Sequence, residues 1–358
     1  MKLLESIKLG NQLLKNKMVM APMTRSRANM NGVVGNSTVL YYTQRASAGL
    51  IVSEAINISE QATGSPLTPG IYTSEQIEAW KEVTKAVHEN GGVIYAQLWH
   101  TGRVGHSLVK NGALPVAPSA IAIQGQQHFT MEGQKDYETP KELSIEEIKN
   151  IIQDFKQAST NAIEAGFDGV ELHSAFGYLP NQFLAESSNQ RTDEYGGNDE
   201  NRNRFVIEVM QEMVEAIGED KVAIRLSPTS SYNGIVHQNP TEQFTILINE
   251  LNKMPLSYIH LMNIPFPADK FPNYPVNNVE TFGKLSQHTI IANCGYTKET
   301  GEAELEKGIA KMISYGTLFL ANPDLPKRFE LNAELNQADR ATMYSGQDKG
   351  YIDYPFLN

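Results

Sequence analysis

Apolar positions recur along the chain in short runs separated by segments with helical spacing, and this alternation predicts a repeating strand–loop–helix unit. The segment 169–175 shows the strand pattern clearly, because its side chains alternate between two faces before Gly177 interrupts it. The eight runs that we interpret as strands cover residues 17–23, 50–59, 93–99, 169–175, 222–228, 257–263, 289–295 and 312–320. They are apolar almost throughout, as parallel strands are when other elements cover both of their faces.

The segments between these runs carry the spacing of amphipathic helices. In 144–166, Ser144 and Glu147 form a capping-box pattern, apolar residues follow at intervals of three and four, and Gly166 ends the segment. The segments 73–89, 199–217, 241–253 and 297–307 read similarly. Eight strand–helix units predict an α/β fold, a (β/α)8 TIM barrel made by residues 1–358 as one domain, with active residues at the carboxyl ends of its strands. An open doubly wound sheet is the structural alternative.

Three further segments stand outside the repeat. Residues 3–16 alternate weakly around the turn pair Gly10-Asn11, which predicts an N-terminal hairpin that caps the barrel. The connections 101–143 and 265–282 are longer than about 15 residues, so we expect them to form lids on the catalytic rim. The aromatic residues expected to wall a pocket there, or to fold over it from the tail, are Phe129, Phe266, Phe271, Tyr274, Tyr351, Tyr354 and Phe356.

Composition narrows the class of protein. The formal net charge of −11, from 30 Lys and Arg against 41 Asp and Glu, argues against nonspecific binding to nucleic acid or to an anionic membrane. The single cysteine, Cys294, excludes an intramolecular disulfide and a cysteine-based zinc site, and no metal-ligand set stands out. No segment has the apolar length of a secretion signal or a membrane span, so we expect a cytoplasmic protein. We also expect a monomer or homodimer that acts on a small-molecule substrate.

Polar residues at the ends of four predicted strands should converge in a barrel. Gln97 can meet the adjacent acceptor and donor on the pyrimidine edge of a flavin, and Arg225 can place positive charge near its N1 and O2 atoms. Thr24 can donate to O4. His173 and Tyr178 follow as groups that donate hydrogen bonds and move protons. Individually, each also suits a structural role. Gln97 could be a hydrogen-bonded amide inside the barrel, Arg225 half of a buried ion pair, His173 a core histidine and Tyr178 a packed aromatic side chain.

Barrels commonly bind phosphate with the loops after strands seven and eight. Here these loops are 293–297 and 314–318, whose glycines let backbone N–H groups approach a phosphate. A helix that begins near Thr297 would add the positive end of its dipole. Two ordinary strand-to-helix turns are the alternative.

Several motifs in order carry a resemblance over nearly the whole chain. They are Ala-Pro-Met-Thr-Arg at 21–25, Gln-Leu-Trp-His-Thr-Gly-Arg at 97–103, Arg-Thr-Asp-Glu-Tyr-Gly-Gly at 191–197, Ala-Asn-Pro-Asp-Leu at 321–325 and Gly-Tyr-Ile-Asp-Tyr-Pro at 350–355. With them the sequence resembles the Old Yellow Enzyme family of FMN-dependent ene-reductases, and particularly its bacterial branch of N-ethylmaleimide reductase and pentaerythritol tetranitrate reductase.

The resemblance implies an activity and a role for each site residue. NADPH or NADH would reduce FMN; a hydride from flavin N5 would then reach the β carbon of an activated alkene such as an α,β-unsaturated carbonyl, while Tyr178 protonates the α carbon. Nitro compounds and quinones are further candidate substrates. The implied flavin contacts are Pro22, Met23, Thr24, Ala55, Gln97 and Arg225; the implied phosphate contacts are Cys294, Gly295, Gly316 and Thr317; the implied substrate contacts are His173, Trp99, Phe176 and Tyr351.

Three positions depart from the family pattern. Phe176 stands where the family has a second His or an Asn that shares the substrate oxygen, Thr317 where relatives have an Arg, and Cys294 where they have a Gly. A phenyl ring cannot donate a hydrogen bond, so we expect weak or altered enone reduction. Backbone donors can still hold a phosphate beside Thr317 and Cys294, so we expect FMN to remain, held less tightly. The departures keep open a flavin-binding protein that has lost turnover and acts as a ligand binder or sensor. A barrel lyase or aldolase without flavin is a third hypothesis.

Overall fold

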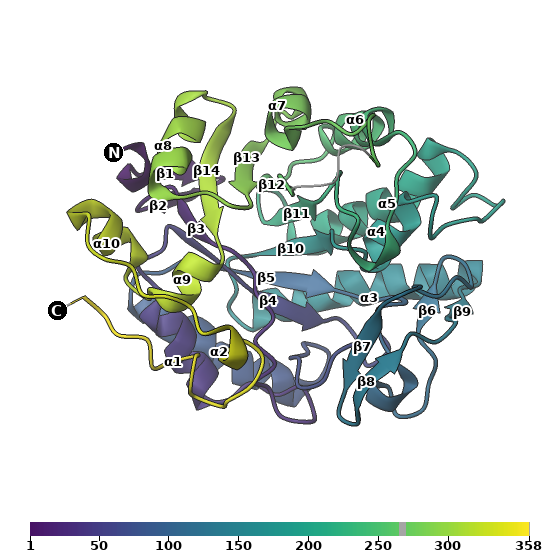
Figure 1. Cartoon of the computed structure of the whole chain (residues 1–358), viewed down its shortest axis with the longest axis horizontal. Coiled ribbons are helices and arrows are strands. Elements are labelled where there is room, and N and C mark those ends of the chain that lie inside the picture. The colour runs from purple at the N-terminus through teal and green to yellow at the C-terminus, as the bar shows by residue number, and fades with distance from the viewer. Residues whose placement is uncertain (265–269, 358) are drawn as a thin grey trace.

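A computed structural model describes residues 1–264 and 270–357, and within them eight parallel strands close into a barrel. Around the barrel the strands follow one another in chain order, and the last pairs with the first (Figure 1). They are β3 (Met18–Met20), β4 (Leu50–Asn57), β5 (Ile94–Trp99), β10 (Gly169–Ser174), β11 (Val222–Leu226), β12 (Tyr258–Met262), β13 (Thr289–Asn293) and β14 (Ala310–Tyr315). The predicted barrel is confirmed, and the open-sheet alternative is wrong because the sheet has no free edge.

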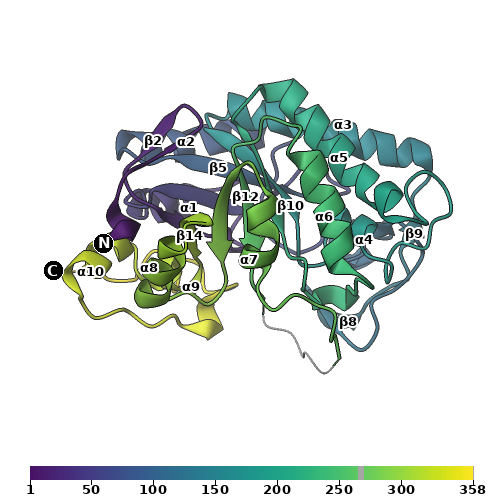
Figure 2. The same cartoon turned by 90° about the horizontal axis from the view of Figure 1, so that it is seen from above.

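Helices cover the outside of the barrel (Figure 2), and the five segments with helical spacing are all helical. The helices are α1 (Asn36–Gln44), α2 (Ser74–Glu89), α3 (Ile145–Glu164), α4 (Leu179–Leu184), α5 (Asp199–Ile217), α6 (Pro240–Leu251), α7 (Asn278–Phe282), α8 (Lys298–Glu306), α9 (Thr317–Ala321) and α10 (Leu325–Leu331), with 3-10 turns at Lys2–Leu4, Ser107–Val109, Tyr232–Gly234, Gly283–Leu285 and Arg340–Thr342. The predicted capping box is present: the Ser144 side chain accepts from the Glu147 N–H, and the Glu147 side chain accepts from the Ser144 N–H.

Several strands are shorter than predicted, and the eighth differs most in kind. The run 312–320 was expected to be strand throughout, but β14 ends at Tyr315 and residues 317–321 form α9. The backbone turns at Gly316, and Phe319 and Leu320 are buried as helix residues. A short apolar run fits a buried strand and a buried helix turn equally well, so its hydrophobicity could not locate the end of the strand.

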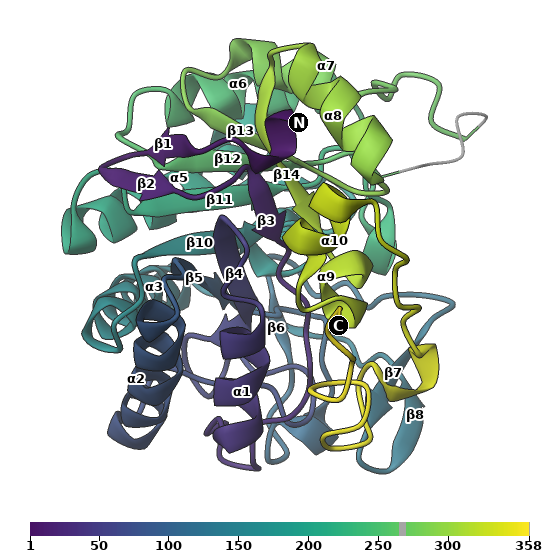
Figure 3. The ribbon, with the colours of Figure 1, turned by 90° about the vertical axis from the view of Figure 1, so that its left-hand side faces the viewer.

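The N-terminal hairpin closes the amino-terminal end of the barrel. Strands β1 (Ile7–Leu9) and β2 (Gln12–Leu14) pair antiparallel around Gly10, which adopts a positive φ of 54° (Figure 3). Leu9 and Leu14 are buried in one cluster with side chains from the barrel strands, among them Tyr95 and Tyr258. The predicted cap is confirmed, and it leaves the carboxyl ends of the strands as the open face.

Both long rim connections contain secondary structure within their described residues. The first carries two small sheets, in which β6 (Val116–Ala117) pairs with β9 (Lys141–Glu142), and β7 (Gln127–Thr130) pairs with β8 (Gly133–Asp136). In the second, Phe266 lies outside the described residues, Phe271 stacks on Tyr274 with ring centroids 4.7 Å apart, and α7 follows. No helix in the described part of the chain has both the length and the apolar character needed to cross a bilayer.

Candidate active site

A cavity of about 550 Å³ opens at the carboxyl ends of the barrel strands, within the size range of small-molecule sites. Its walls come from β5, β10, β11, β12, β13 and β14, from the residues that follow β3 and several of these strands, and from residues 343 and 344 of the tail. Twelve of the residues expected from the sequence line it: Pro22, Met23, Thr24, Gln97, His173, Phe176, Tyr178, Arg225, Cys294, Gly295, Gly316 and Thr317. The barrel therefore brings together residues from Pro22 to Thr317, which lie 295 positions apart in the chain.

Three expected residues do not line this cavity. Ala55 is buried beside Gln97, its partner in the β4–β5 ladder. Trp99 lines a neighbouring cavity and contacts the ring of Tyr178, with centroids 4.7 Å apart. Tyr351 is 0% exposed and stacks on Tyr41 at 4.2 Å.

The burial of Tyr351 corrects the expectation that it contacts the substrate. Its ring lies under two guanidinium groups, 4.6 Å from that of Arg27 and 5.6 Å from that of Arg25. Stacking and cation–π contacts hold it in the packing behind the cavity wall, so it supports the site without reaching it.

The buried carboxylate of Glu171, which sequence reasoning did not single out, orients the side-chain amide of Gln97. Glu171 lies opposite Gln97 in the β5–β10 ladder and accepts a hydrogen bond from its Nε2 at 2.7 Å. The second carboxylate oxygen lies 2.9 Å from Nδ1 of His260. Both Glu171 and His260 are fully buried. The alternation of side chains along β10 could have indicated Glu171, because it puts Glu171 on the same face as His173. The sequence gives no indication of its partner His260, which lies on β12, 89 residues away.

Charges in this cluster have defined signs. Burial raises the pKa of Glu171, but the opposing effects of His260, Arg225 and Gln97 leave that pKa below its ordinary value, so the group is a carboxylate. Burial lowers the pKa of His260, so its ring is neutral and Nδ1–H donates to the carboxylate. Glu171 and the guanidinium of Arg225 therefore form a buried pair of opposite charges beneath the cavity.

Arg225 has an unused donor. Its Nη2 donates to Oδ1 of Asn293 at 2.9 Å, and Asn293 in turn donates to the backbone oxygen of Ser314. Its Nε is buried and has no hydrogen-bond partner among the described residues. A buried donor without an acceptor costs about 1–3 kcal/mol, so the geometry favours a ligand that brings an acceptor to this guanidinium.

His173 and Tyr178 lie edge to face, with ring centroids 4.8 Å apart. Burial, together with the nearby Arg225 and His260, lowers the pKa of His173 well below its ordinary value, so the imidazole is neutral. Its Nδ1 has no partner among the described residues. Burial raises the pKa of Tyr178, which keeps the proton on the phenol at physiological pH. The pair can offer a neutral hydrogen-bond donor and a proton.

Phe176 has an unusual backbone conformation and contributes an apolar face. Its φ of 55° lies in the left-handed region that residues other than glycine and asparagine rarely adopt. Its N–H donates to Oγ of Ser227, and its backbone oxygen accepts from Nδ2 of Asn233 at 2.8 Å. The ring centroid lies 5.5 Å from the guanidinium carbon of Arg225 and 6.2 Å from the ring of His173. The side chain thus covers a cation and offers no hydrogen bond.

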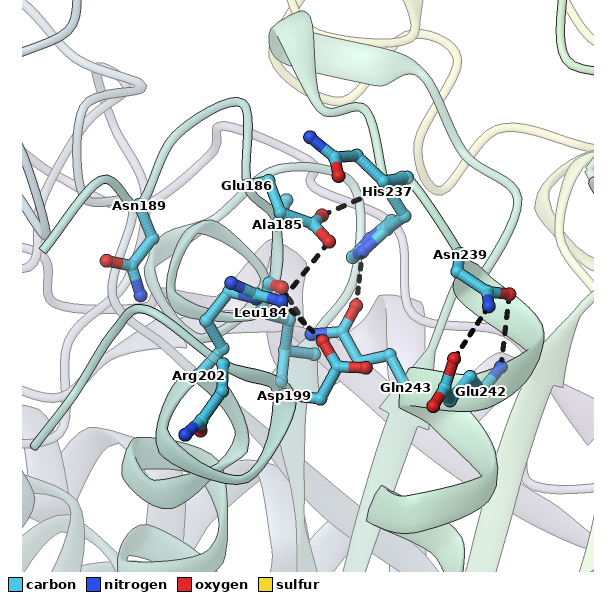
Figure 4. A network of polar contacts seen from close by, with 12 residues as sticks. Leu184, Ala185, Glu186, Asn189, Asp199, Arg202, His237, Asn239, Glu242 and Gln243 are labelled. Carbon is cyan, nitrogen blue, oxygen red and sulfur yellow. Dashed lines mark hydrogen bonds and ion pairs between the residues drawn. The ribbon is translucent and has the colours of Figure 1, made fainter. Parts of the chain in front are cut away.

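The connection between β11 and α6 is anchored by a polar network that the sequence did not reveal (Figure 4). In this network the ring of the buried His237 lies 2.8 Å from Oε1 of Gln243, and Nε2 of Gln243 donates to the backbone oxygen of Leu184. Arg202 contacts Asp199 and, at 3.3 Å, Glu186. Burial lowers the pKa of His237 to about 4, so it bonds as a neutral ring. These contacts tie the connection between β11 and α6 to α4 and α5.

The two loops expected at a phosphate have open space at their glycines, and Cys294 in the first loop has a strained backbone. A Cβ at Gly295, where φ is 78°, would meet no atom within 4 Å, and one at Gly316 would come no closer than 3.6 Å, so both glycines border open space. Cys294 adopts a φ of 95°, which is strained for a side chain with a Cβ. Helix α8 begins beside them, with Thr297 as its N-cap. Arg25 and Arg225 are the cations among the described residues of this cavity, and neither belongs to these loops.

These features fit FMN. The unpaired buried nitrogen of Arg225 and the oriented amide of Gln97 suit a flat ring with carbonyl and imine acceptors. The open backbone at Gly295 and Gly316 suits a phosphate arm. The Thr317 side chain can add a hydroxyl, but no charge.

Comparisons with known proteins agree with this geometry. A sequence model of the NADH:flavin oxidoreductase / NADH oxidase family matches residues 2–336. The chain is 43% identical to 12-oxophytodienoate reductase 1 of Oryza sativa subsp. japonica, over 99% of this chain and 93% of that protein. It is 39% identical to 12-oxophytodienoate reductase 2 of Arabidopsis thaliana, over 99% and 96%.

Solved structures show the same similarity. The Old Yellow Enzyme homologue from Zymomonas mobilis superposes with a TM-score of 0.95 at 40% identity and covers 100% of both chains. Morphinone reductase in complex with tetrahydroNAD gives 0.94 at 42% identity, over 100% of this chain and 98% of that one. The flavin-free lyase or aldolase hypothesis is therefore wrong, and the chain belongs to the NADH:flavin oxidoreductase family, the Old Yellow Enzyme family, as an FMN-dependent NAD(P)H oxidoreductase of the ene-reductase type.

Proposed function

We propose that this protein reduces α,β-unsaturated carbonyls and similar electron-poor alkenes, with His173 and Tyr178 as the residues that act on the substrate. The observation that carries the proposal is the meeting of Thr24, Gln97 and Arg225 with these two residues around one cavity. When bound, FMN supplies the hydride that the β carbon of the alkene receives and is itself reduced by NADPH or NADH. Nitro compounds and quinones are further candidate substrates.

Several of the chain's residues are proposed to hold the cofactor. Gln97 would meet the pyrimidine edge of the ring with the amide that Glu171 orients, and Arg225 would place positive charge beside it. The full proposed set is Pro22, Met23, Thr24, Ala55, Gln97 and Arg225 at the ring and Cys294, Gly295, Gly316 and Thr317 at the phosphate. Ala55 supports the ring indirectly, through its place beside Gln97.

The substrate's carbonyl oxygen would accept a hydrogen bond from the neutral ring of His173. Negative charge grows on this oxygen as the alkene gains a hydride, so a preorganised donor lowers the barrier. Tyr178 would protonate the α carbon, because its phenol keeps its proton and Trp99 holds the ring edge-on at 4.7 Å.

Phe176 leaves His173 as the one proposed donor to that oxygen. A missing donor costs about 2.7–4 kcal/mol where it serves the transition state, and about 1 kcal/mol where it only supports binding. We therefore propose enone reduction that is slow compared with that of an enzyme with two donors. The second candidate function, a flavin-binding protein without turnover, rests on this same side chain, but the comparisons do not favour it.

One preparation separates the two candidate functions. The purified protein should be yellow, bleach under anaerobic conditions with NADPH or NADH, and regain its colour when cyclohexenone is added. Bleaching without recovery on any enone, nitroalkene or quinone would favour the flavin binder. A colourless protein that binds no added FMN would overturn the proposal.

The remaining proposals concern the setting of the enzyme. We propose a single FMN-binding domain over residues 1–358 and a monomer or homodimer, which sedimentation analysis would resolve. The single cysteine, Cys294, supports a cytoplasmic location, because proteins of a reducing compartment rarely contain disulfides and this chain can form none within itself. The place in the bacterial branch stays a prediction, because plant reductases also match over the whole chain.

A further inference from the structure

Glu171 and His260 form a buried pair that the proposed chemistry does not use. Oε2 of Glu171 lies 2.9 Å from Nδ1 of His260, and both side chains are 0% exposed. The two residues come from β10 and β12, and β11 lies between these strands in the barrel (Figure 1). Neither side chain lines the active-site cavity. The pair therefore lies inside the barrel and can affect a ligand only through other residues.

The side chain of His260 has one polar partner among the described residues, which is Glu171. Nε2 of His260 is buried and has no hydrogen-bond partner there. Burial lowers the pKa of His260, and so does the positive charge of Arg225, which lies opposite it in the β11–β12 ladder. The ring is neutral, with its proton on Nδ1. His260 is thus a neutral donor directed at a single carboxylate.

This donor helps to keep Glu171 charged. The groups that face Glu171 from neighbouring strands are Gln97 on β5, Arg225 on β11, and Tyr258 and His260 on β12. Its carboxylate accepts two side-chain hydrogen bonds, from Nε2 of Gln97 at 2.7 Å and from Nδ1 of His260. Burial raises the pKa of Glu171, and His260 is the largest of the influences that bring it below the ordinary value. Loss of His260 therefore shifts Glu171 toward its protonated, neutral form.

The charge of Glu171 sets two properties of the cavity above it. As a carboxylate, Glu171 only accepts, so it fixes the amide of Gln97; as an acid it can donate, and the amide is free to turn and accept. As a carboxylate it also opposes the charge of Arg225, and as an acid it leaves that charge unopposed. Gln97 and Arg225 both line the cavity. A change at His260 therefore reaches the cavity through Glu171.

We infer that His260 is a positioning residue for the flavin, because its Nδ1–H holds Glu171 in the charged form that orients Gln97 and balances Arg225. The inference rests on the proposed function in one respect, that Gln97 and Arg225 contact the flavin. With Glu171 neutral, a net positive charge would remain beneath the flavin and favour its reduced, more anionic form. His260 thus helps to set the reduction potential of FMN without touching it.

The reduction potential of FMN, measured with redox dyes between about pH 6 and pH 9, tests this inference. In His260→Leu the donor is lost, so Glu171 should be protonated at the lower end of this range. The potential there should rise by about 30 mV, a tenfold change in the two-electron equilibrium, and return toward the wild-type value as Glu171 ionises at higher pH. His260→Asn places an amide nitrogen where Nδ1 was, so its potential should follow the wild type at every pH. A leucine variant that follows the wild type, or an asparagine variant that behaves like leucine, would overturn the inference.

A double variant shows whether His260 acts through Glu171. Glu171→Gln is neutral at every pH, so adding His260→Leu to it should change the two-electron equilibrium by less than about twofold. Independent, additive effects of the two substitutions would overturn the inference. His288→Leu is the matched control, because His288 also contacts a single acceptor, the backbone oxygen of Leu251 at 3.0 Å, and does not line the cavity. Its potential should equal that of the wild type.

A measurement without flavin separates this inference from the proposed function. In NMR spectra of the apoprotein with isotope-labelled glutamate carboxyl groups, Glu54 supplies a reference, because burial raises its pKa to about 7. His260→Leu should show one further carboxyl resonance that titrates between about pH 6 and pH 9, and the wild type, His260→Asn and the double variant should not.

The outcomes are distinguishable. If this NMR pattern holds but the protein binds no FMN or reduces no enone, the proposed function fails and the role of His260 toward Glu171 stands. If enones are reduced but Glu171 titrates alike in the wild type and His260→Leu, the inference fails alone. His260→Gln supplies the same comparison if the leucine variant does not fold, because its amide nitrogen takes the place of Nε2 and leaves Glu171 without the donor.

Discussion

Glu171 accepts a hydrogen bond from Nε2 of Gln97 at 2.7 Å, across neighbouring strands of the barrel. Because a carboxylate only accepts, the nitrogen of the Gln97 amide must point toward Glu171, and the orientation of the amide oxygen is set with it. The same carboxylate opposes the charge of Arg225. One buried residue therefore sets both the direction of the amide and the net charge beneath the cavity.

The Glu171→Gln variant should alter the bound flavin without removing a side chain. It retains an acceptor for Gln97 but removes a negative charge near Arg225, so the reduced, more anionic flavin should gain stability. We expect the reduction potential of FMN to rise by about 30 mV, a tenfold change in the two-electron equilibrium, measured by equilibration with redox dyes. Glu208→Gln is the control, since that carboxylate accepts from the hydroxyl of Tyr195. An unchanged or lower potential in Glu171→Gln would contradict the assignment.

Replacing Tyr178 by Phe should separate the two half-reactions. The variant keeps the ring contacts with Trp99 and His173 but loses the proton. Flavin reduction by NADPH should continue at its normal rate, while reoxidation by cyclohexenone should slow by about 10²–10⁴-fold, which is the range for a lost general acid. Stopped-flow spectroscopy of the visible absorption band of the flavin follows both steps. Equal slowing of both half-reactions would point to disturbed flavin binding instead.

Enone reduction should depend little on pH between about 6 and 9. Burial lowers the pKa of His173, so the ring is neutral throughout this window and would take up a proton only well below its ordinary value of 6.5. Burial raises the pKa of Tyr178, so the phenol loses its proton only above 10. The reoxidation rate measured across this pH range should therefore lack an inflection. A clear inflection near pH 6.5 would show that His173 titrates normally.

Phe176→Asn should speed enone reduction. Asn tolerates the left-handed backbone at this position and adds an amide donor beside His173. We expect kcat/KM for cyclohexenone to rise between about fivefold, if the donor only supports binding, and several hundredfold, if it serves the transition state. Phe176→Leu is the control, because it keeps an apolar side chain without a donor. The idea fails if Asn and Leu give the same rate as the wild type.

Thr317→Arg should tighten FMN binding. The exposed Thr317 lines the loop proposed at the phosphate, and a charge-assisted bond there is worth about 1.5–3 kcal/mol, or roughly 10–100-fold in Kd. Fluorescence titration of the apoprotein with FMN at low and high salt gives the measurement. Thr245→Arg, on α6, changes the net charge equally at a distant site and should have no effect. An equal gain in both variants would mean that overall charge, and not a phosphate contact, is responsible.

Much of the fold could be read from periodicity, because a barrel strand buried on both faces has an apolar run that needs no knowledge of its neighbours. The convergence of Thr24, Gln97, His173 and Arg225 could also be predicted, since the carboxyl ends of parallel strands meet on one face whatever the loops do. Other features depended on partners far along the chain. Nothing local to Glu171 indicates His260, although the two meet at 2.9 Å.

By itself, then, the sequence determined the barrel, the face on which the polar residues converge and most of the residues that line the cavity there. Only the tertiary structure decided which of those residues act through others. It turned residues 317–321 into a helix turn, buried Tyr351 between Tyr41 and two guanidinium groups, and set Phe176 over Arg225. The physical reason is that strand formation follows from local hydrophobic spacing, whereas the burial and charge of a side chain follow from neighbours that only the closed barrel assembles.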